Sequence, residues 1–112
     1  FFIGRSYNDR WLIDRQLNGN VCEARIWDVA RTQEEIWKNM YDIEDPENEA
    51  HLAAYWKFNE GSGNDIKDYS KYHNDAHIVR YWKDFNSKEE YDVKNEELWP
   101  SGIEVPQVNR ED

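Results

Sequence analysis

The sequence contains few residues that crosslink, kink or loosen a chain: among 112 residues there are one cysteine, three prolines and five glycines. With Cys22 as the single cysteine, the chain cannot form an internal disulfide. No apolar run approaches the roughly 18 residues that a membrane-spanning helix requires. A signal-peptide pattern is also absent, and residues 1–4 are typical of the middle of a strand. We therefore expect the chain to be the C-terminal part of a longer domain.

Aliphatic residues are scarce as well, since Leu, Ile, Val and Phe together number 22. A low content of these four residue types combined with a net charge of −10 is typical of a disordered chain. The aromatic residues oppose that interpretation: there are six Trp, seven Tyr and four Phe. Each buried ring removes roughly 150–250 Å² from water. The composition therefore predicts a folded domain whose core relies on rings.

The negative charge is concentrated in two windows. Residues 42–49 hold five carboxylates and no base, and residues 84–97 hold six carboxylates and two lysines. An acidic chain is repelled by phosphate backbones, so nucleic acid is not expected as a partner. We expect residues 84–97 to form a solvated loop.

Alternation of apolar and polar residues predicts two principal strands, at 21–27 and 52–59. In the first, Cys22, Ala24 and Ile26 form a core-like face, with Cys22 a buried small residue. Glu23, Arg25 and Trp27 form the opposite face. In the second, the apolar face is predicted to consist of Leu52, Ala54, Trp56 and Phe58. Shorter strands are expected at 1–5, 66–68, 76–82 and 99–108, and residues 7–11 are loop-like.

One short helix is expected near residues 33–41. Thr32 and Glu35 fit a capping box, in which each side chain binds the backbone N–H of the other residue. Apolar side chains then recur at helical spacing and predict one buried face, formed by Ile36, Trp37, Met40 and Tyr41.

Two stretches resemble laminin-G-like domains of the concanavalin A-like lectin superfamily. Residues 18–27, Asn-Gly-Asn-Val-Cys-Glu-Ala-Arg-Ile-Trp, resemble the NGxIxEVRIW strand of those domains, and residues 30–36 resemble the helix that follows. Residues 54–63, with Asp68 and Asn74-Asp75, resemble their YWKFNEGSG…D…GND stretch. Residues 99–106 resemble the tail of exported Bacteroides-type lipoproteins. The turn 68–75 departs from the family pattern, because Lys71, Tyr72 and His73 replace glycines.

The resemblance implies an all-β, concanavalin A-like jelly-roll sandwich. Residues 1–109 would be the C-terminal portion of one such domain, holding its later strands, and residues 110–112 would be a tail. The N-terminal strands would lie on a missing or separate segment, which is then an expected partner. The resemblance also implies export to the periplasm, the outer membrane or the cell surface, and a non-catalytic, carbohydrate-binding function.

Candidate ligand-binding residues combine rings with polar groups. Rings expected in loops or at strand ends suit sugars, because a pyranose has an apolar face and a hydroxyl rim. Alternatively, the rings close the rims of the sandwich, and Glu23 and Arg25 form a structural ion pair. The candidate ligand-binding residues are Tyr7, Trp11, Tyr69, Tyr72, Trp82, Glu23 and Arg25.

Oxygen-rich loops could bind calcium, which takes six to eight oxygen ligands. The candidate calcium ligands are Asn59, Glu60, Asp65, Asp68, Asn74 and Asp75. The same residue types are ordinary turn formers, so a structural role is the alternative. The spacing of His51, His73 and His77 does not fit a zinc site.

An enzyme is not expected. Glu23 and Glu60 could form the carboxylate pair of a glycoside hydrolase. However, the sequence lacks the Glu-x-Asp-x-Glu strand of the catalytic relatives in this superfamily. Protein–protein interaction or scaffolding is the alternative function from another class.

Overall fold

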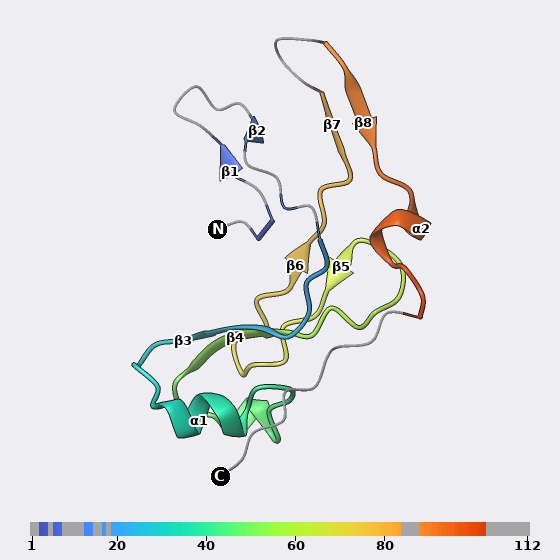
Figure 1. The fold of residues 1–112 in the computed structure, drawn as a ribbon. Helices are drawn as coiled ribbons and strands as arrows, with labels where there is room; N and C mark the ends of the chain where they lie inside the picture. The colour runs from blue at the N-terminus through green and yellow to red at the C-terminus, as the bar shows by residue number, and fades with distance from the viewer. Residues whose placement is uncertain are drawn as a thin grey trace.

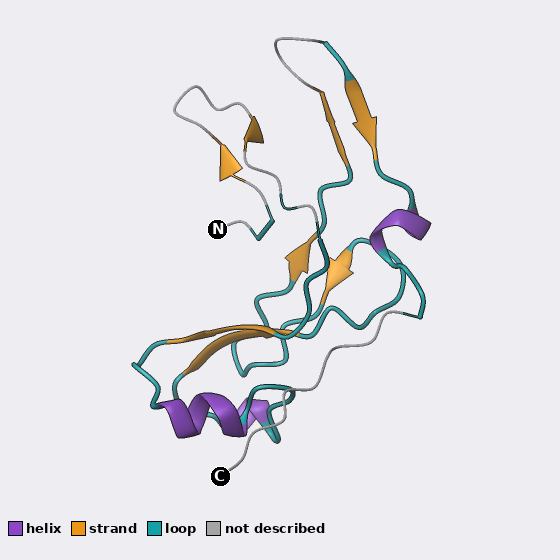
Figure 2. Ribbon diagram, viewed as in Figure 1, coloured by secondary structure: helices purple, strands orange, loops and turns teal. Residues whose placement is uncertain are grey.

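The computed structural model describes residues 3–4, 6–7, 13–14, 17, 19–83 and 88–102. Within these residues, eight short strands form four two-stranded antiparallel sheets: β1 with β2, β3 with β4, β5 with β6, and β7 with β8. Loops and turns connect them (Figure 2). This strand-rich structure with few short helices is compatible with the expected all-β class. The elements are β1 (Ser6–Tyr7), β2 (Ile13–Asp14), β3 (Ala24–Trp27), α1 (Gln33–Lys38), η1 (Pro46–Asn48), β4 (Leu52–Trp56), β5 (Asp65–Ile66), β6 (Ala76–His77), β7 (Tyr81–Lys83), β8 (Glu90–Asp92) and α2 (Asn95–Leu98).

The sheet of β3 and β4 lies beside α1, toward one end of the molecule (Figure 1). Ala24 pairs with Trp56, and Ile26 pairs with Ala54, but Trp27 pairs with Leu52. The register therefore skips Ala53, which is the irregularity of a β-bulge. The bulge places Leu52 on the same side of the sheet as Tyr55. The prediction that Leu52 shares a face with Ala54 and Trp56 is thus wrong.

Each face of this sheet carries one small hydrophobic cluster. On one face, which we call the Tyr55 face, Ile43, Leu52 and Tyr55 are buried, and Trp27 and Tyr69 pack against them. On the other, the Trp56 face, the buried residues are Ala54, Trp56 and Ile66. The residues packed against that second cluster are Ala24, Phe58, Ala76, Ile78 and Trp99.

The first predicted strand begins later than its alternation suggested. Glu23 has a φ of +52°, in the left-handed region, so the extended backbone of β3 starts only at Ala24. Cys22 therefore lies outside the strand and is exposed, not buried. β4 similarly ends at Trp56, two residues before Phe58, whose φ is +58°.

The helix begins as predicted and ends earlier. The capping box is confirmed: Thr32 Oγ1 accepts the Glu35 N–H, and the Glu35 carboxylate accepts the Thr32 N–H. α1 ends at Lys38 with Asn39 as its C-cap. The predicted apolar face is only partly correct, because Ile36 is 52 % exposed, whereas Trp37, Met40 and Tyr41 are half-buried.

Several other expectations need correction. The window 84–97 is not a continuous loop, because it contains β8 and α2. The predicted strand 76–82 is divided into β6 and the start of β7, with residues 78–80 between them. Tyr7, expected in a loop, belongs to β1, while Ile3 and Gly4 form a bend instead of a strand. Residues 99–102 belong to no strand, and the remainder of the predicted last strand lies outside the described residues.

Candidate functional site

The turn from Asp68 to Asp75 is built around one fully buried carboxylate. Oδ1 of Asp68 accepts hydrogen bonds from the amides of Tyr55 (2.9 Å) and Ser70 (2.8 Å). Oδ2 accepts from the Ser70 hydroxyl (2.9 Å) and the Asn74 amide (2.8 Å). The Asp75 carboxylate in turn accepts the amide of Asp68 at 2.9 Å. Asp68 therefore joins β4 to both ends of the turn.

These donors determine the protonation state of Asp68. Burial acts to raise the pKa of its carboxyl group, but the backbone N–H groups of Ser70, Tyr55 and Asn74 lower it. The net pKa lies below the ordinary 3.8. The carboxylate is thus ionised at neutral pH, and its charge is stabilised by hydrogen bonds.

A polar cluster surrounds the hydroxyl of Tyr55 on the Tyr55 face. This oxygen lies 2.9 Å from Glu23 Oε1 and 3.1 Å from Asp42 Oδ1, and it can donate its proton to either carboxylate. Burial, followed by these two carboxylates, raises the pKa of Tyr55 well above its usual range. Burial also acts to raise the pKa of Asp42, but the Tyr55 hydroxyl and the Lys57 ammonium lower it overall.

Arg25 completes this cluster. Its guanidinium carbon lies 5.0 Å from the centroid of the Tyr55 ring, and Nη1 donates to the carbonyl of Asn39. Nη2 lies 3.4 Å from Glu23 Oε2, close enough for an ion pair, although neither atom has a hydrogen-bond partner in the described part of the chain. The Arg25 and Glu23 side chains are only 14 % and 19 % exposed, so these two atoms, which could still form hydrogen bonds, are largely shielded from water.

Tyr69 connects this cluster to the Asp68 turn. The ring centroids of Tyr55 and Tyr69 are 6.1 Å apart. Nζ of Lys57 lies 4.8 Å from the Tyr69 centroid, and Nζ of Lys67 lies 4.6 Å from it. Farther along the turn, the Tyr72 ring is 52 % exposed and lies 5.2 Å from Nζ of Lys71. Two rings and three lysines thus border the turn that Asp68 holds.

The structure brings together three of the predicted ligand-binding residues, Glu23, Arg25 and Tyr69. Tyr72 follows on the same turn. The Tyr7 and Trp82 side chains and all of Trp11 lie outside the described residues. Sequence analysis missed Tyr55, Asp42 and Lys57, of which Tyr55 is the hub. Tyr55 and Lys57 could have been found from the sequence, because they alternate with the apolar residues of the predicted strand 52–59 and therefore share its polar face.

The predicted calcium ligands are dispersed over the turn and the loop before it. Glu60 Oε2 accepts the Lys67 amide at 2.9 Å, and Asp65 pairs with His77 at 3.1 Å. Asp68 and Asp75 accept the backbone hydrogen bonds described above. Among the residues that the structure describes, no group of three or more His, Cys, Asp or Glu side chains is placed to hold a metal ion.

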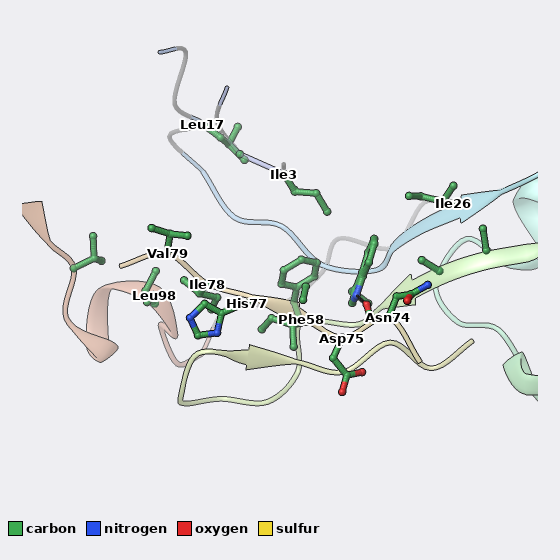
Figure 3. A pocket seen from close by; sticks show the side chains of 17 residues that line it. Ile3, Leu17, Ile26, Phe58, Asn74, Asp75, His77, Ile78, Val79 and Leu98 are labelled. Carbon is green, nitrogen blue, oxygen red and sulfur yellow. Dashed lines mark hydrogen bonds between the residues drawn. The ribbon is translucent and has the colours of Figure 1, made fainter. Parts of the chain in front are cut away.

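An apolar pocket of about 750 Å³ opens on the Trp56 face. Figure 3 shows Ile3 and Leu17 across it from Phe58 and Ile78. Ile26 is 37 % exposed at its edge. The volume falls within the range of ligand pockets, and the lining is dominated by aliphatic and aromatic side chains. This pocket does not include the Tyr55 cluster.

Comparison with family models, curated proteins and solved structures found no match. Within the described residues, no helix is both long and apolar enough to cross a membrane.

Proposed function

We propose that this chain is a carbohydrate-binding module, without catalytic activity, of an exported or cell-surface bacterial protein. The observation that carries the proposal is the Tyr72 ring, which is 52 % exposed on a turn fixed by the buried carboxylate of Asp68. A rigid, exposed ring can stack on the apolar face of a sugar at a low cost in conformational entropy. The Lys71 ammonium group, 5.2 Å from the centroid of this ring, supplies hydrogen-bond donors beside it.

The laminin-G-like resemblance supports the same function, since it implies a jelly-roll lectin fold. In that fold, β3 and β4, which carry the Tyr55 face, would belong to one sheet of the sandwich. The resemblance is carried by β3, β4 and the Asp68 turn, which are the elements that position Tyr69 and Tyr72.

A glycan array probed with the full-length protein tests the proposal. We expect binding to at least one glycan, and a strong reduction with Tyr72→Ala. Ile36→Ala is a matched control, because Ile36 on α1 has the same exposed fraction as Tyr72. A full-length protein that binds no glycan, or an equal loss in both variants, would contradict the proposal.

The apolar pocket favours a second candidate function, interaction with another polypeptide segment. We propose that the occupant is the complementary β-segment of the same domain. In its support, β3 pairs only with β4 among the described strands, so its outer edge can accept another strand. Ile26 of β3 is exposed beside the pocket, where the side chains of an added layer would cover it. Recovery of a specific protein partner while glycans fail to bind would favour scaffolding as the main function.

A further inference from the structure

Two lysine side chains converge on the half-buried ring of Tyr69. Their ammonium nitrogens lie 4.8 Å (Lys57) and 4.6 Å (Lys67) from the ring centroid. Both distances are within the roughly 6 Å over which a cation and a ring attract each other. The ring therefore holds two positive charges at one place on a chain whose net charge is −10.

The two lysines differ in their counterions. Lys57 forms an ion pair with Asp42 at 3.4 Å. No carboxylate in the described part of the chain forms an ion pair with the Lys67 ammonium group. Glu60 accepts the backbone amide of Lys67 instead, which fixes the main chain from which this side chain extends. Lys67 is therefore an exposed cation, positioned against a ring, that can bind an external anion.

We propose that the surface formed by Lys57, Lys67 and Tyr69 binds an acidic sugar, whose carboxylate or sulfate group contacts the Lys67 ammonium. This inference rests on the proposed carbohydrate-binding function and adds the chemical class of the glycan. A charge-assisted hydrogen bond to Lys67 would be stronger than a bond between neutral groups. The Tyr72 ring on the same turn would stack on an adjoining sugar.

The negative charge of the whole chain does not prevent this contact. The first acidic window, residues 42–49, reaches this surface, where Asp42 pairs with Lys57 and Glu47 Oε1 lies 3.4 Å from Nε2 of His73. Exposed charges farther away are screened over about 8 Å at physiological ionic strength. Lys67, which forms no ion pair with a carboxylate in the described part of the chain, then supplies the charge that attracts a bound anion. A consequence is that binding weakens as salt concentration rises.

Isothermal titration of the full-length protein tests the proposal with two pairs of oligosaccharides. One pair is an oligogalacturonate and its neutral methyl ester, and the other is a sulfated galactan oligosaccharide and its desulfated form. We expect at least one acidic member to bind about tenfold more tightly than its neutral match, as one charge-assisted hydrogen bond implies. Which pair shows the difference identifies the acid as carboxylate or sulfate.

Lys67→Gln should abolish this preference, whereas Lys94→Gln, which removes the same charge from the N-cap of α2, should preserve it. Thermal melting of both variants checks that they fold. Equal affinity for acidic and neutral members would overturn the acidic-sugar inference and leave glycan binding intact. An equal effect of both variants would also overturn it, because the preference would then reflect long-range charge. A protein that binds no oligosaccharide and no glycan on the array would contradict the proposed function itself.

Discussion

Asp68 shows how one side chain can organise a turn. A buried carboxylate is costly unless its oxygen atoms are satisfied, and here both oxygens accept two hydrogen bonds each. Three of the donors are backbone amides that would otherwise lack partners at the end of β4 and in the turn. Asp68 thus has a structural role in positioning Tyr69 and Tyr72.

We expect Asp68→Asn to lower the free energy of unfolding by about 2–4 kcal/mol. An asparagine amide group would place its own donors against two of the present donors, and the site is fully buried. Urea denaturation measures the change. Asp65→Asn is the control, because the Asp65 side chain is 91 % exposed and should change stability by about 0.5 kcal/mol at most. Similar losses in both variants would contradict the role assigned to Asp68.

The lowered pKa of Asp68 predicts how stability depends on pH. Because the pKa is lower in the folded state than the ordinary 3.8, the folded state favours the ionised form. The resulting stabilisation is present above the unfolded-state pKa and is lost as pH falls through the folded-state pKa. Unfolding free energies measured from pH 7 to pH 2.5 should therefore decline at the acid end. Asp68→Asn should show a shallower decline, and an unchanged acid dependence in that variant would refute this assignment.

At the scale of elements, α1 depends on its N-terminus more than on its packing. It has only six residues, and none of them is buried, so neither length nor core contacts stabilise it strongly. The capping box supplies two hydrogen bonds, of 3.2 Å and 3.0 Å, where backbone N–H groups would otherwise be unpaired. Arg31, whose guanidinium carbon lies 3.6 Å from the centroid of the Trp27 ring, ties this end of the helix to β3.

Thr32→Ala should destabilise the protein by about 1 kcal/mol, because it removes the side chain that accepts the Glu35 N–H. Thr32→Ser keeps that oxygen and serves as the control. Thermal unfolding followed by far-ultraviolet circular dichroism compares the two variants. If the serine variant lost as much stability as the alanine variant, the methyl group and not the cap would be responsible.

At the scale of the whole molecule, the two hydrophobic clusters are small and lie on opposite faces of one two-stranded sheet. The radius of gyration is 16.5 Å, compared with roughly 13 Å for a compact domain of this length. The Tyr55 face is covered by neighbouring loops, whereas the Trp56 face leads into the open apolar pocket. The face of β3 that alternation predicted to be core-like, with Ala24 and Ile26, is thus the more open one.

We therefore expect the 112-residue chain to enhance the fluorescence of ANS at neutral pH, since this dye binds exposed apolar surface. Ile26→Glu should reduce the enhancement, because Ile26 lines the pocket. Ile36→Glu introduces the same change on α1, where the side chain is also exposed, and should have little effect. Adding the complementary segment should suppress dye binding and make unfolding cooperative. If the chain did not enhance ANS fluorescence, the pocket would not be an open hydrophobic surface. An equal effect of both substitutions would lead to the same conclusion.

Sequence reasoning located the features that depend on neighbouring residues. The capping box of Thr32 and Glu35 placed the start of α1, and alternation identified β3 and β4, the two strands that pair in one sheet. The candidates Glu23, Arg25 and Tyr69 also came from the sequence, and the structure gathers them around one hub. These features were predictable because they depend only on the spacing of nearby residues. A capping box joins residues three apart, and the two faces of a strand alternate from one residue to the next.

Tertiary structure alone decided which side of the sheet each residue occupies and which residue is the hub. Alternation assumes an unbroken extended backbone, but the bulge at Ala53 moves Leu52 to the Tyr55 face, and the left-handed Glu23 leaves Cys22 exposed. The Tyr55 hydroxyl meets Glu23 and Asp42 only because the chain folds back, across separations of 32 and 13 residues. Contacts over such distances depend on strand pairing and loop paths, which local patterns of hydrophobicity do not specify.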